Sequence, residues 1–458
     1  TKFLGASLYG TWSLIWVTIV LVTPLAVLGL QAAFTRFLAA ETDTDTIRER
    51  FLSVVFTVLG AGILVSLILI LCSDLFASSI IGDINSSYLV KLASFMILTQ
   101  TLSQIGVTFF RTFRQMKWYS ALTVAKAAAQ VGLMGCFLLL GWELKGVIIA
   151  VIISDILCLA IAFFIALKQV GFQLPRFTEL KSYLKYGLPL VPTSAMLWII
   201  NSSDRYMIGY FMEANDVGIY TAAYSLAHLI SLFLGPLQVV LLPTVSKSYD
   251  DGEIAKTRTY LKYSLKYVMM LAIPAAFGLS ILASPLLRIL TTSEFTPGSI
   301  VIPFLSFGIL FYGLYQVCLH VIYLVKKTCW VVRLLSVSAA LNIGLNLLLI
   351  PRMGILGASM ASLIAYAVLG VVTTVISLRY FKFDLGLPFI AKSVLASAVM
   401  ALIIWLFNPL SITRVIISIL LGAVIYSAII FALKGFNKNE LSMVKDFVSG
   451  FSIRRHDK

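Results

Sequence analysis

Charged residues are scarce in this sequence. Only 12% of its 458 residues are Asp, Glu, Lys or Arg, whereas about a quarter of the residues of a soluble protein are charged. Hydrophobic residues make up 60% of the chain, and the mean hydropathy is +0.98. This composition excludes a soluble globular protein. Because long apolar segments cross a bilayer as helices, we expect an all-α polytopic membrane protein.

The sequence also lacks the short motifs of soluble enzymes and metal sites. Its five cysteines form no CxxC pair, its three histidines lie far apart, and it has neither GxxxxGK[ST] nor GxSxG. We therefore expect no catalytic residue, no metal and no cofactor. The net charge of +15 does not indicate a nucleic-acid partner, because the positive residues lie in short loops between apolar runs.

Apolar runs of spanning length recur along the whole chain. Their number predicts thirteen transmembrane helices, at roughly 8–34, 51–76, 88–113, 117–141, 145–168, 187–212, 217–243, 259–284, 299–325, 329–350, 355–380, 387–407 and 411–434. The loops between them are short, and none is long enough to hold a soluble active site.

Lysine and arginine are unevenly spread over these loops. Alternate loops are rich in them, whereas the opposite loops hold only Lys2, Lys145, Arg288, Arg352 and Arg414. The positive-inside rule therefore predicts that the C-terminus is cytoplasmic and Thr1 is outside. Since the chain starts at Thr rather than Met, we expect that a first helix is missing, which would make fourteen. The basic inner face favours contact with anionic membrane lipids.

Two parts of the chain about 210 residues apart resemble each other. Trp118 matches Trp330, Gly146 matches Gly357, and Leu8-Tyr9-Gly10 echoes Val217-Gly218-Ile219-Tyr220. An even number of spans per repeat predicts parallel repeats. The predicted organisation is an N-lobe lacking its first helix, a cytoplasmic linker, a C-lobe, two additional helices and a cytoplasmic tail, at 1–168, 169–186, 187–380, 387–434 and 435–458.

Span 88–113 carries a stripe of polar residues. Gln100, Gln104, Thr108 and Arg111 lie on one face of a helix, at i, i+4, i+8 and i+11. Such a stripe is typical either of a cavity wall or of hydrogen bonds between helices. We take Gln100 and Gln104 as candidates for a substrate cavity.

Ionisable residues also occur at membrane depth. The depths of Lys126 and Asp155 differ by about 6 Å, at about 1.5 Å per residue, so the two can pair. The pair is either structural or a candidate for ion coupling. In span 187–212, Asn201 lies one turn from both Asp204 and Arg205.

These three residues form either a structural lock or part of a cavity, and Asp204 is also an ion-coupling candidate. Arg36, at the inner end of the first span, is either an interface anchor or a phosphate contact.

Three stretches together carry a resemblance to a known family. They read LGASLYGTWSL…GLQAAFTRFLA, LKYGLPLVP…DRYMIGYF…VGIYTAAYSLA and LNIGLNLLLIPRMGILGASMAS. In this order they resemble the polysaccharide-biosynthesis (O-antigen type) flippases of the multidrug/oligosaccharidyl-lipid/polysaccharide exporter superfamily. The resemblance implies two six-helix lobes around a central cavity. It also implies Arg36, Asp204 and Arg205 as cavity candidates.

The same resemblance implies a function. A polyprenyl-(pyro)phosphate-linked oligosaccharide would be moved across the cytoplasmic membrane by alternating access, for cell-surface polysaccharide or glycan assembly. The expected partners are this substrate, membrane lipids, H⁺ or Na⁺, and glycan-assembly enzymes.

Two other functions compete with this one. The first is a cation-coupled multidrug or small-molecule antiporter of the same superfamily, which twelve spans without an extra pair would favour. The second is an integral-membrane glycosyltransferase or polymerase, which would need a catalytic acid or base in a sizeable outer loop. The short outer loops argue against this second alternative.

Overall fold

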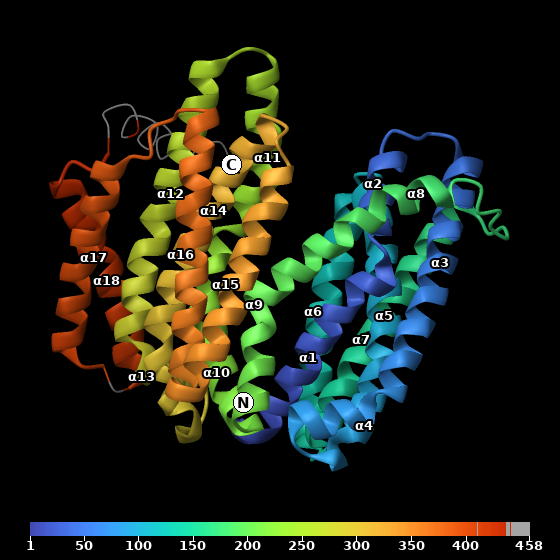
Figure 1. The fold of residues 1–458 in the computed structure, drawn as a ribbon, viewed down its shortest axis with the longest axis horizontal. Helices are drawn as coiled ribbons and strands as arrows, with labels where there is room; N and C mark the ends of the chain where they lie inside the picture. The colour runs from blue at the N-terminus through green and yellow to red at the C-terminus, as the bar shows by residue number, and fades with distance from the viewer. Residues whose placement is uncertain (410, 437–439, 441–458) are drawn as a thin grey trace, which may run out of the picture. The chain divides into compact units, whose positions relative to one another are not determined.

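The computed structural model describes residues 1–409, 411–436 and 440, without the side chains of 236–239. Within these residues every regular element is a helix (Figure 1). Most of the predicted tail at 435–458 lies outside the described residues. By its internal packing the chain divides into two units. Unit 1 comprises Thr1–Ala222 and Leu335–Ala361, and unit 2 comprises Ala223–Leu334 and the described residues from Ser362 onward.

Unit 1 contains the N-terminal helices and part of a later hairpin. Its elements are α1 (Gly5–Val27), α2 (Leu30–Leu38), α3 (Thr44–Leu71), α4 (Ser73–Phe76), η1 (Ala77–Ile81), η2 (Ile84–Ser86), α5 (Ser87–Thr112), α6 (Met116–Leu139), α7 (Glu143–Val170), α8 (Leu180–Gly187), η3 (Leu188–Leu190), α9 (Val191–Phe211), most of α10 (Ala214–Ala227), most of α15 (Cys329–Met353) and the start of α16 (Ile355–Tyr380).

Unit 2 contains the remaining helices. They are η4 (His228–Phe233), α11 (Gly235–Asp250), α12 (Ile254–Ile281), α13 (Ala283–Leu290), η5 (Ser293–Val301), α14 (Ile302–Leu324), the rest of α16, α17 (Leu387–Phe407) and α18 (Ile412–Ala432). Helices α17 and α18 lie side by side and pack on α12 (Figure 1). Phe389, Met400 and Tyr426 belong to the apolar cluster between them.

The all-helical membrane fold is confirmed, but the number of spans is not. Among the described residues, 11 helices are long and apolar enough to cross a membrane. The other two predicted spans, 187–212 and 217–243, fall on α9 and on the series α10, η4 and α11. The polar residues of α9 lower its hydropathy, and the 3₁₀ turn of η4 interrupts the second span. Thirteen spans therefore stay a prediction.

The predicted lobe boundary at 169–186 does not coincide with the division into units. Helix α9 groups with unit 1 because it is bonded to α1. Trp198 donates a hydrogen bond to the carbonyl of Val17 at 2.7 Å, and the hydroxyls of Thr18 and Tyr206 lie 2.6 Å apart. The two-lobe organisation stays a prediction.

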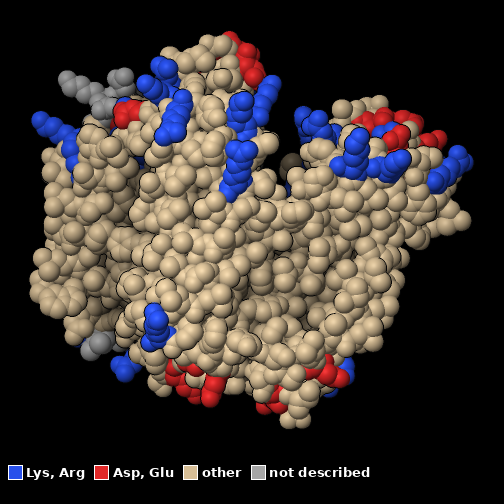
Figure 2. Space-filling model, viewed as in Figure 1, with Lys and Arg blue, Asp and Glu red and all other residues tan. Residues whose placement is uncertain are grey.

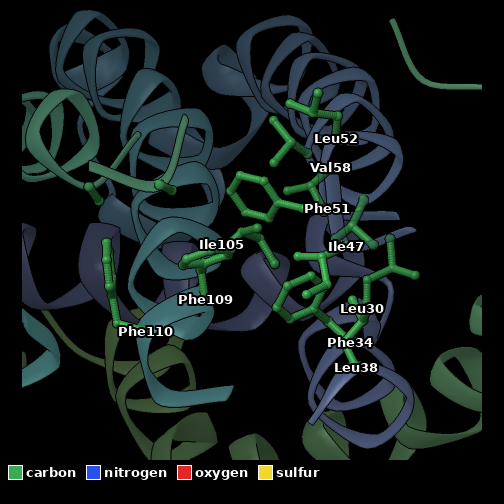
Figure 3. Close-up of a cluster of buried hydrophobic side chains, with 14 of the residues drawn as sticks. Leu30, Phe34, Leu38, Ile47, Phe51, Leu52, Val58, Ile105, Phe109 and Phe110 are labelled. Atoms are coloured by element: carbon green, nitrogen blue, oxygen red, sulfur yellow. The ribbon is translucent and has the colours of Figure 1, made fainter. Parts of the chain in front are cut away.

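Aromatic packing fixes the core of unit 1 at the α2 end. The rings of Phe34 and Phe51 lie 5.9 Å apart, and those of Phe51 and Phe109 lie 5.0 Å apart. Figure 3 shows these side chains from α2, α3 and α5 pointing toward one another. Tilted ring pairs of this kind add to the free energy of burial. The cluster holds α2 against α3 and α5.

The first predicted span, 8–34, is broken rather than continuous. Leu28 and Gly29 both adopt left-handed backbone conformations, with φ of 54° and 67°, which ends α1 and reorients the chain into α2. A Cβ atom on Gly29 would lie 2.2 Å from the carbonyl oxygen of Gly187. The break in α1 therefore packs backbone to backbone against the end of α8.

Helices α1 and α10 meet through residues that the repeat relates. A Cβ on Gly10 would lie 1.7 Å from the carbonyl oxygen of Ala214, and one on Gly218 would lie 1.9 Å from that of Ala6. The hydroxyls of Ser13 and Thr221, 208 positions apart, lie 2.7 Å from each other. Ala6 and Ala214, Gly10 and Gly218, and Ser13 and Thr221 are each 208 positions apart, and the two glycine contacts are reciprocal. The seam therefore has a local twofold relation, as expected if α1 and α10 are equivalent elements of two repeats.

Basic side chains gather at one end of each unit. In unit 1 they lie over α2 and α8, and in unit 2 over the start of α12 (Figure 2). The residues include Arg36, Lys181 and Lys185 in the first unit and Lys256, Arg258 and Lys262 in the second. These belong to the loops that we predict to be cytoplasmic.

Candidate functional site

A polar pocket of about 290 Å³ lies in unit 1 at the break between α1 and α2. It is lined by Thr23, Pro24, Val27, Gly29, Gln31, Ala32, Gln104, Arg111, Leu190, Val191 and Ser194. Gln31 and Gln104 face each other, with their amide groups 3.4 Å apart. We name this cavity the α1–α2 pocket.

The chemistry of the α1–α2 pocket suits an oxygen-rich, anionic group. Its described lining offers amides, hydroxyls and the guanidinium of Arg111, but no carboxylate. Guanidinium and amide N–H groups are strong donors to phosphate and hydroxyl oxygens. The predicted polar stripe is thus divided: Gln104 and Arg111 line the pocket, whereas the buried Gln100 does not. The other lining residues were not selected from the sequence. Among them only Gln31 gave a signal, because it is a polar residue within an apolar run.

Arg36 lies outside this pocket. Its guanidinium packs over the ring of Tyr186 at 5.4 Å, and the neighbouring Phe37 stacks on Tyr183 at 5.1 Å. Both contacts hold α2 against α8. The geometry fits the anchor interpretation of Arg36, while a phosphate contact stays a proposal.

Asp204 and Arg205 of α9 form a buried charged network. Arg205 Nη1 donates to Asp204 Oδ1 at 3.0 Å and to the backbone carbonyl of Asn201 at 2.7 Å. The hydroxyl of Tyr220, from α10, donates to Asp204 Oδ2 at 2.5 Å. The side chains of Arg205 and Asp204 are only 5% and 2% exposed. We call this group the α9 network.

The α9 network differs from the prediction in two details. Asn201 contributes its backbone carbonyl to Arg205, while its side-chain amide donates to Leu197 O at 2.7 Å. Tyr220, which sequence reasoning missed, supplies the second partner of Asp204. A tyrosine sixteen positions away gives no local signal, because only the packing of α9 on α10 brings the two together.

A polar contact links α9 to α15. Ser203 donates to Asn342 Oδ1 at 3.1 Å, and Asn346 Nδ2 donates to the same oxygen at 3.0 Å. All three residues are buried. The amide of Asn342 therefore joins α15 to α9, and Asn346 holds that amide in place.

Lys126 of α6 and Asp155 of α7 form the predicted ion pair. Asp155 is fully buried, whereas the side chain of Lys126 is 25% exposed. Among the described residues, Lys126 is the only partner of the Asp155 carboxylate. Helix α6 buries only Leu122, so this pair is a main polar link between α6 and α7.

Comparison with known proteins adds to this geometry. The family described as "Polysaccharide biosynthesis protein" matches residues 1–300. The chain belongs to the polysaccharide biosynthesis protein family. This membership confirms the resemblance seen in the three sequence stretches.

Two named relatives are similar to this chain over different lengths. "Probable low-salt glycan biosynthesis flippase Agl15" of Haloferax volcanii is 25% identical over 372 residues, which cover 79% of this chain and 77% of that protein. "Probable lipid II flippase MurJ" of Rhizobium tropici is 25% identical over 232 residues, which cover 47% of this chain and 42% of the relative.

Solved structures show the same fold. The structure described as "Lipid II flippase MurJ, inward closed conformation" superposes with a TM-score of 0.77 at 18% identity and covers 94% of each chain. An inward-facing multidrug resistance MATE family transporter superposes with a TM-score of 0.70 at 15% identity, covering 82% of this chain and 90% of that chain. The chain therefore has the fold of these two proteins.

Proposed function

We propose that this chain is a flippase that moves a lipid-linked oligosaccharide across the cytoplasmic membrane, with its C-terminus on the cytoplasmic side. The observation that carries the proposal is its likeness to a glycan biosynthesis flippase over 79% of the chain. The fold likeness to a lipid II flippase over 94% of the chain supports it further. The first is described as a probable glycan biosynthesis flippase and the second as a lipid II flippase.

Each unit contains a cavity, and the two cavities differ in the chemistry of their lining. The α1–α2 pocket presents amides and a guanidinium, as a phosphate or pyrophosphate requires. In unit 2 an apolar groove of about 600 Å³ runs between η4, α12, α17 and α18. Its described lining is almost wholly hydrocarbon, including Met270, Leu279 and Ile404. An isoprenoid chain is compatible with this lining, because it can pack on apolar side chains without burying a polar group.

A polar headgroup needs such a protein to cross. Each polar group without a hydrogen-bond partner costs several kcal/mol in hydrocarbon, about 2–7 on common scales. A polar pocket replaces the lost water contacts while the tail stays in an apolar environment.

A multidrug antiporter is the second candidate, favoured by the MATE fold likeness. A cationic drug would need an acid in its binding pocket. The described lining of the α1–α2 pocket contains Arg111 and no acid, which favours the anionic substrate. For coupling to H⁺ or Na⁺ we propose Asp155 ahead of Asp204, since both Asp204 oxygens are already bonded.

The test is flipping in proteoliposomes made with the complete protein. A fluorescent lipid-linked oligosaccharide is reconstituted, and a membrane-impermeant quencher reports which leaflet its headgroup occupies. We expect Arg111→Ala to slow flipping about tenfold, because a charge-assisted hydrogen bond contributes about 1.5–3 kcal/mol. Gln104→Ala should have a smaller effect.

The matched control is Lys117→Ala, an exposed basic residue near the same helix end that does not line the pocket. Gradient-driven efflux of small cations without movement of the oligosaccharide would instead assign the antiporter function. The same flipping assay is run on variants of the three cavity candidates from the sequence, namely Arg36→Ala, Asp204→Asn and Arg205→Ala.

A further inference from the structure

A second polar pocket, of about 350 Å³, lies at the opposite end of α5 from Arg111. Its lining includes Leu8, Tyr88, Trp142, Glu143 and Lys145. Three elements build it: the start of α1, the first turn of α5 and the turn between α6 and α7. The loop that carries Trp142 and Lys145 belongs to the set that the positive-inside rule puts outside. We name this cavity the outer pocket.

Two aromatic side chains of the outer pocket are exposed, and one of them is held in a fixed orientation. Tyr88 is 57% exposed and Trp142 is 47% exposed. The ring of Trp142 stacks face to face on Phe137, with centroids 4.8 Å apart and planes 4° apart. This stacking fixes the indole without burying it. An indole held in one orientation offers a ready surface to a ligand at little entropic cost.

The polar side chains of the pocket are available for bonding. Glu143, Lys145 and the hydroxyl of Tyr88 form no hydrogen bond or ion pair with any described residue. A carboxylate and an ammonium on the same rim provide acceptors and donors together. Two opposite charges do not select for a strongly charged ligand, but they match a ligand that carries many hydroxyl groups.

The turn that presents these groups is strained. Gly141 and Glu143 both have positive φ, 77° and 47°. Glutamate rarely adopts this conformation, which costs about 1–3 kcal/mol and persists where its surroundings impose it. Gly146 contributes, because a Cβ there would lie 2.8 Å from Trp142 Cβ and 2.7 Å from Phe137 Cβ. The packing of this turn thus holds Trp142 and Glu143 at the pocket.

We propose that the outer pocket binds carbohydrate. The C–H face of a pyranose ring packs on the electron-rich face of an aromatic ring, while its hydroxyls bond to the carboxylate and ammonium. A volume of about 350 Å³ falls in the range of small-molecule sites, about 300–1,000 Å³. The inference rests on the proposed function only for the source of the sugar, which would be the headgroup arriving at the outer face.

A membrane-interface role is the competing interpretation, since Trp and Tyr concentrate at both bilayer surfaces. Interface anchors need no acid and base beside them and no strained turn. The concave, polar lining of the outer pocket therefore favours carbohydrate over lipid.

The experiment is saturation-transfer difference NMR on the complete protein in lipid nanodiscs. The probes are N-acetylglucosamine, mannose and glucuronate at millimolar concentration. We expect saturation transfer to the ring protons of at least one sugar, reduced by more than about half in Trp142→Ala through loss of the aromatic contact. Trp142→Phe should restore most of it. The matched control is Trp118→Ala, because Trp118 is equally exposed, 46% against 47%, but does not line the outer pocket.

Should Trp142→Ala fail to fold, Glu143→Gln and Tyr88→Phe test the polar contacts without removing an aromatic ring. The proposal is overturned if no sugar shows transfer, or if Trp118→Ala reduces the signal as much as Trp142→Ala. It is also overturned if Trp142→Ala leaves the sugar signal intact and changes only the quenching of tryptophan fluorescence by brominated lipid.

The flipping assay separates this proposal from the proposed function. Flipping by the wild-type protein without any sugar signal would refute the outer pocket alone. A sugar signal that depends on Trp142 without flipping would uphold the outer pocket and refute the flippase.

Discussion

Two acid–base pairs lie at membrane depth in unit 1, and they are built differently. In the α9 network both oxygens of Asp204 are bonded, to Arg205 and to Tyr220. Asp155 is equally buried but has Lys126 as its only described partner. Arg205 is 5% exposed and Lys126 is 25% exposed. An acid with several buried partners acts as a structural element, whereas an acid whose one described partner is a partly exposed lysine has fewer bonds to lose when that partner is exchanged.

Sequence alone gave both acids the same two possible roles, structural or ion-coupling. The difference in their partners separates these roles. Buried charges in a membrane are costly, and they persist where they are paired or functional. The α9 network satisfies its charges completely and also joins α9 to α10, which fits a lock. The Lys126–Asp155 pair leaves room for a proton or sodium ion to replace the lysine, which fits the coupling role that we propose.

Breaking the α9 network should have the largest effect on stability. Asp204→Ala leaves Arg205 buried without its carboxylate, and removing one partner of a buried pair costs about 3–5 kcal/mol. The measurement is the free energy of unfolding of the purified protein in detergent. Asp250→Asn, at an exposed acid, is the control and should change stability little.

A milder change tests the same network. Tyr220→Phe removes only the hydrogen bond to Asp204 Oδ2, and an unsatisfied buried acceptor costs about 1–3 kcal/mol. The loss in free energy of unfolding should be smaller for Tyr220→Phe than for Asp204→Ala. If both variants unfold like the wild-type protein, the α9 network is not a lock.

Changing the second pair should alter transport more than stability. Asp155→Asn keeps an oxygen that can accept a hydrogen bond from the partly exposed Lys126, so we expect a smaller loss of stability than for Asp204→Ala. We expect flipping in proteoliposomes to lose its dependence on a proton or sodium gradient. The double variant Asp155→Asn/Lys126→Met removes both charges and should recover stability without recovering the gradient dependence.

The two outcomes separate coupling from structure. Flipping by Asp155→Asn that still responds to the gradient would refute the coupling role and leave the pair as a link between α6 and α7.

Much of this architecture could be predicted from the sequence. Long apolar runs predicted the helices, and depth along them predicted the Lys126–Asp155 pair, because depth depends only on helical rise. The Asn201–Asp204–Arg205 cluster was predicted from its spacing for the same reason.

Contacts between distant segments could not be predicted in this way. The breaks at Leu28-Gly29 and at η4 depend on how helices pack, as does the bond from Tyr220 to Asp204. The α1–α2 pocket combines Gln31, Gln104 and Ser194 from three helices. Helical spacing relates residues on one helix, and a single sequence does not show which faces meet.

A third ion pair, outside the membrane spans, extends the comparison to an exposed acid. Breaking this pair should have the smallest effect on stability. Lys262 lies 2.7 Å from Asp384, whose side chain is 59% exposed. The hydrogen bond from Lys262 lowers the pKa of Asp384 below its usual value, and the backbone N–H of Gly386 contributes. A lowered pKa stabilises the folded state above the unfolded pKa, about 3.9, and this contribution is lost as pH falls through the folded pKa.

Because the pair is exposed, its contribution should be about 0.2–1 kcal/mol and should shrink with added salt. The measurement is the difference in free energy of unfolding between wild type and Asp384→Asn, followed from about pH 6 down to about pH 3. We expect the full difference at the upper end and a smaller difference at the lower end, where the unfolded-state carboxyl is mostly protonated. A difference that is constant with pH would mean that Asp384 acts through packing or the turn at Gly386 rather than through its charge.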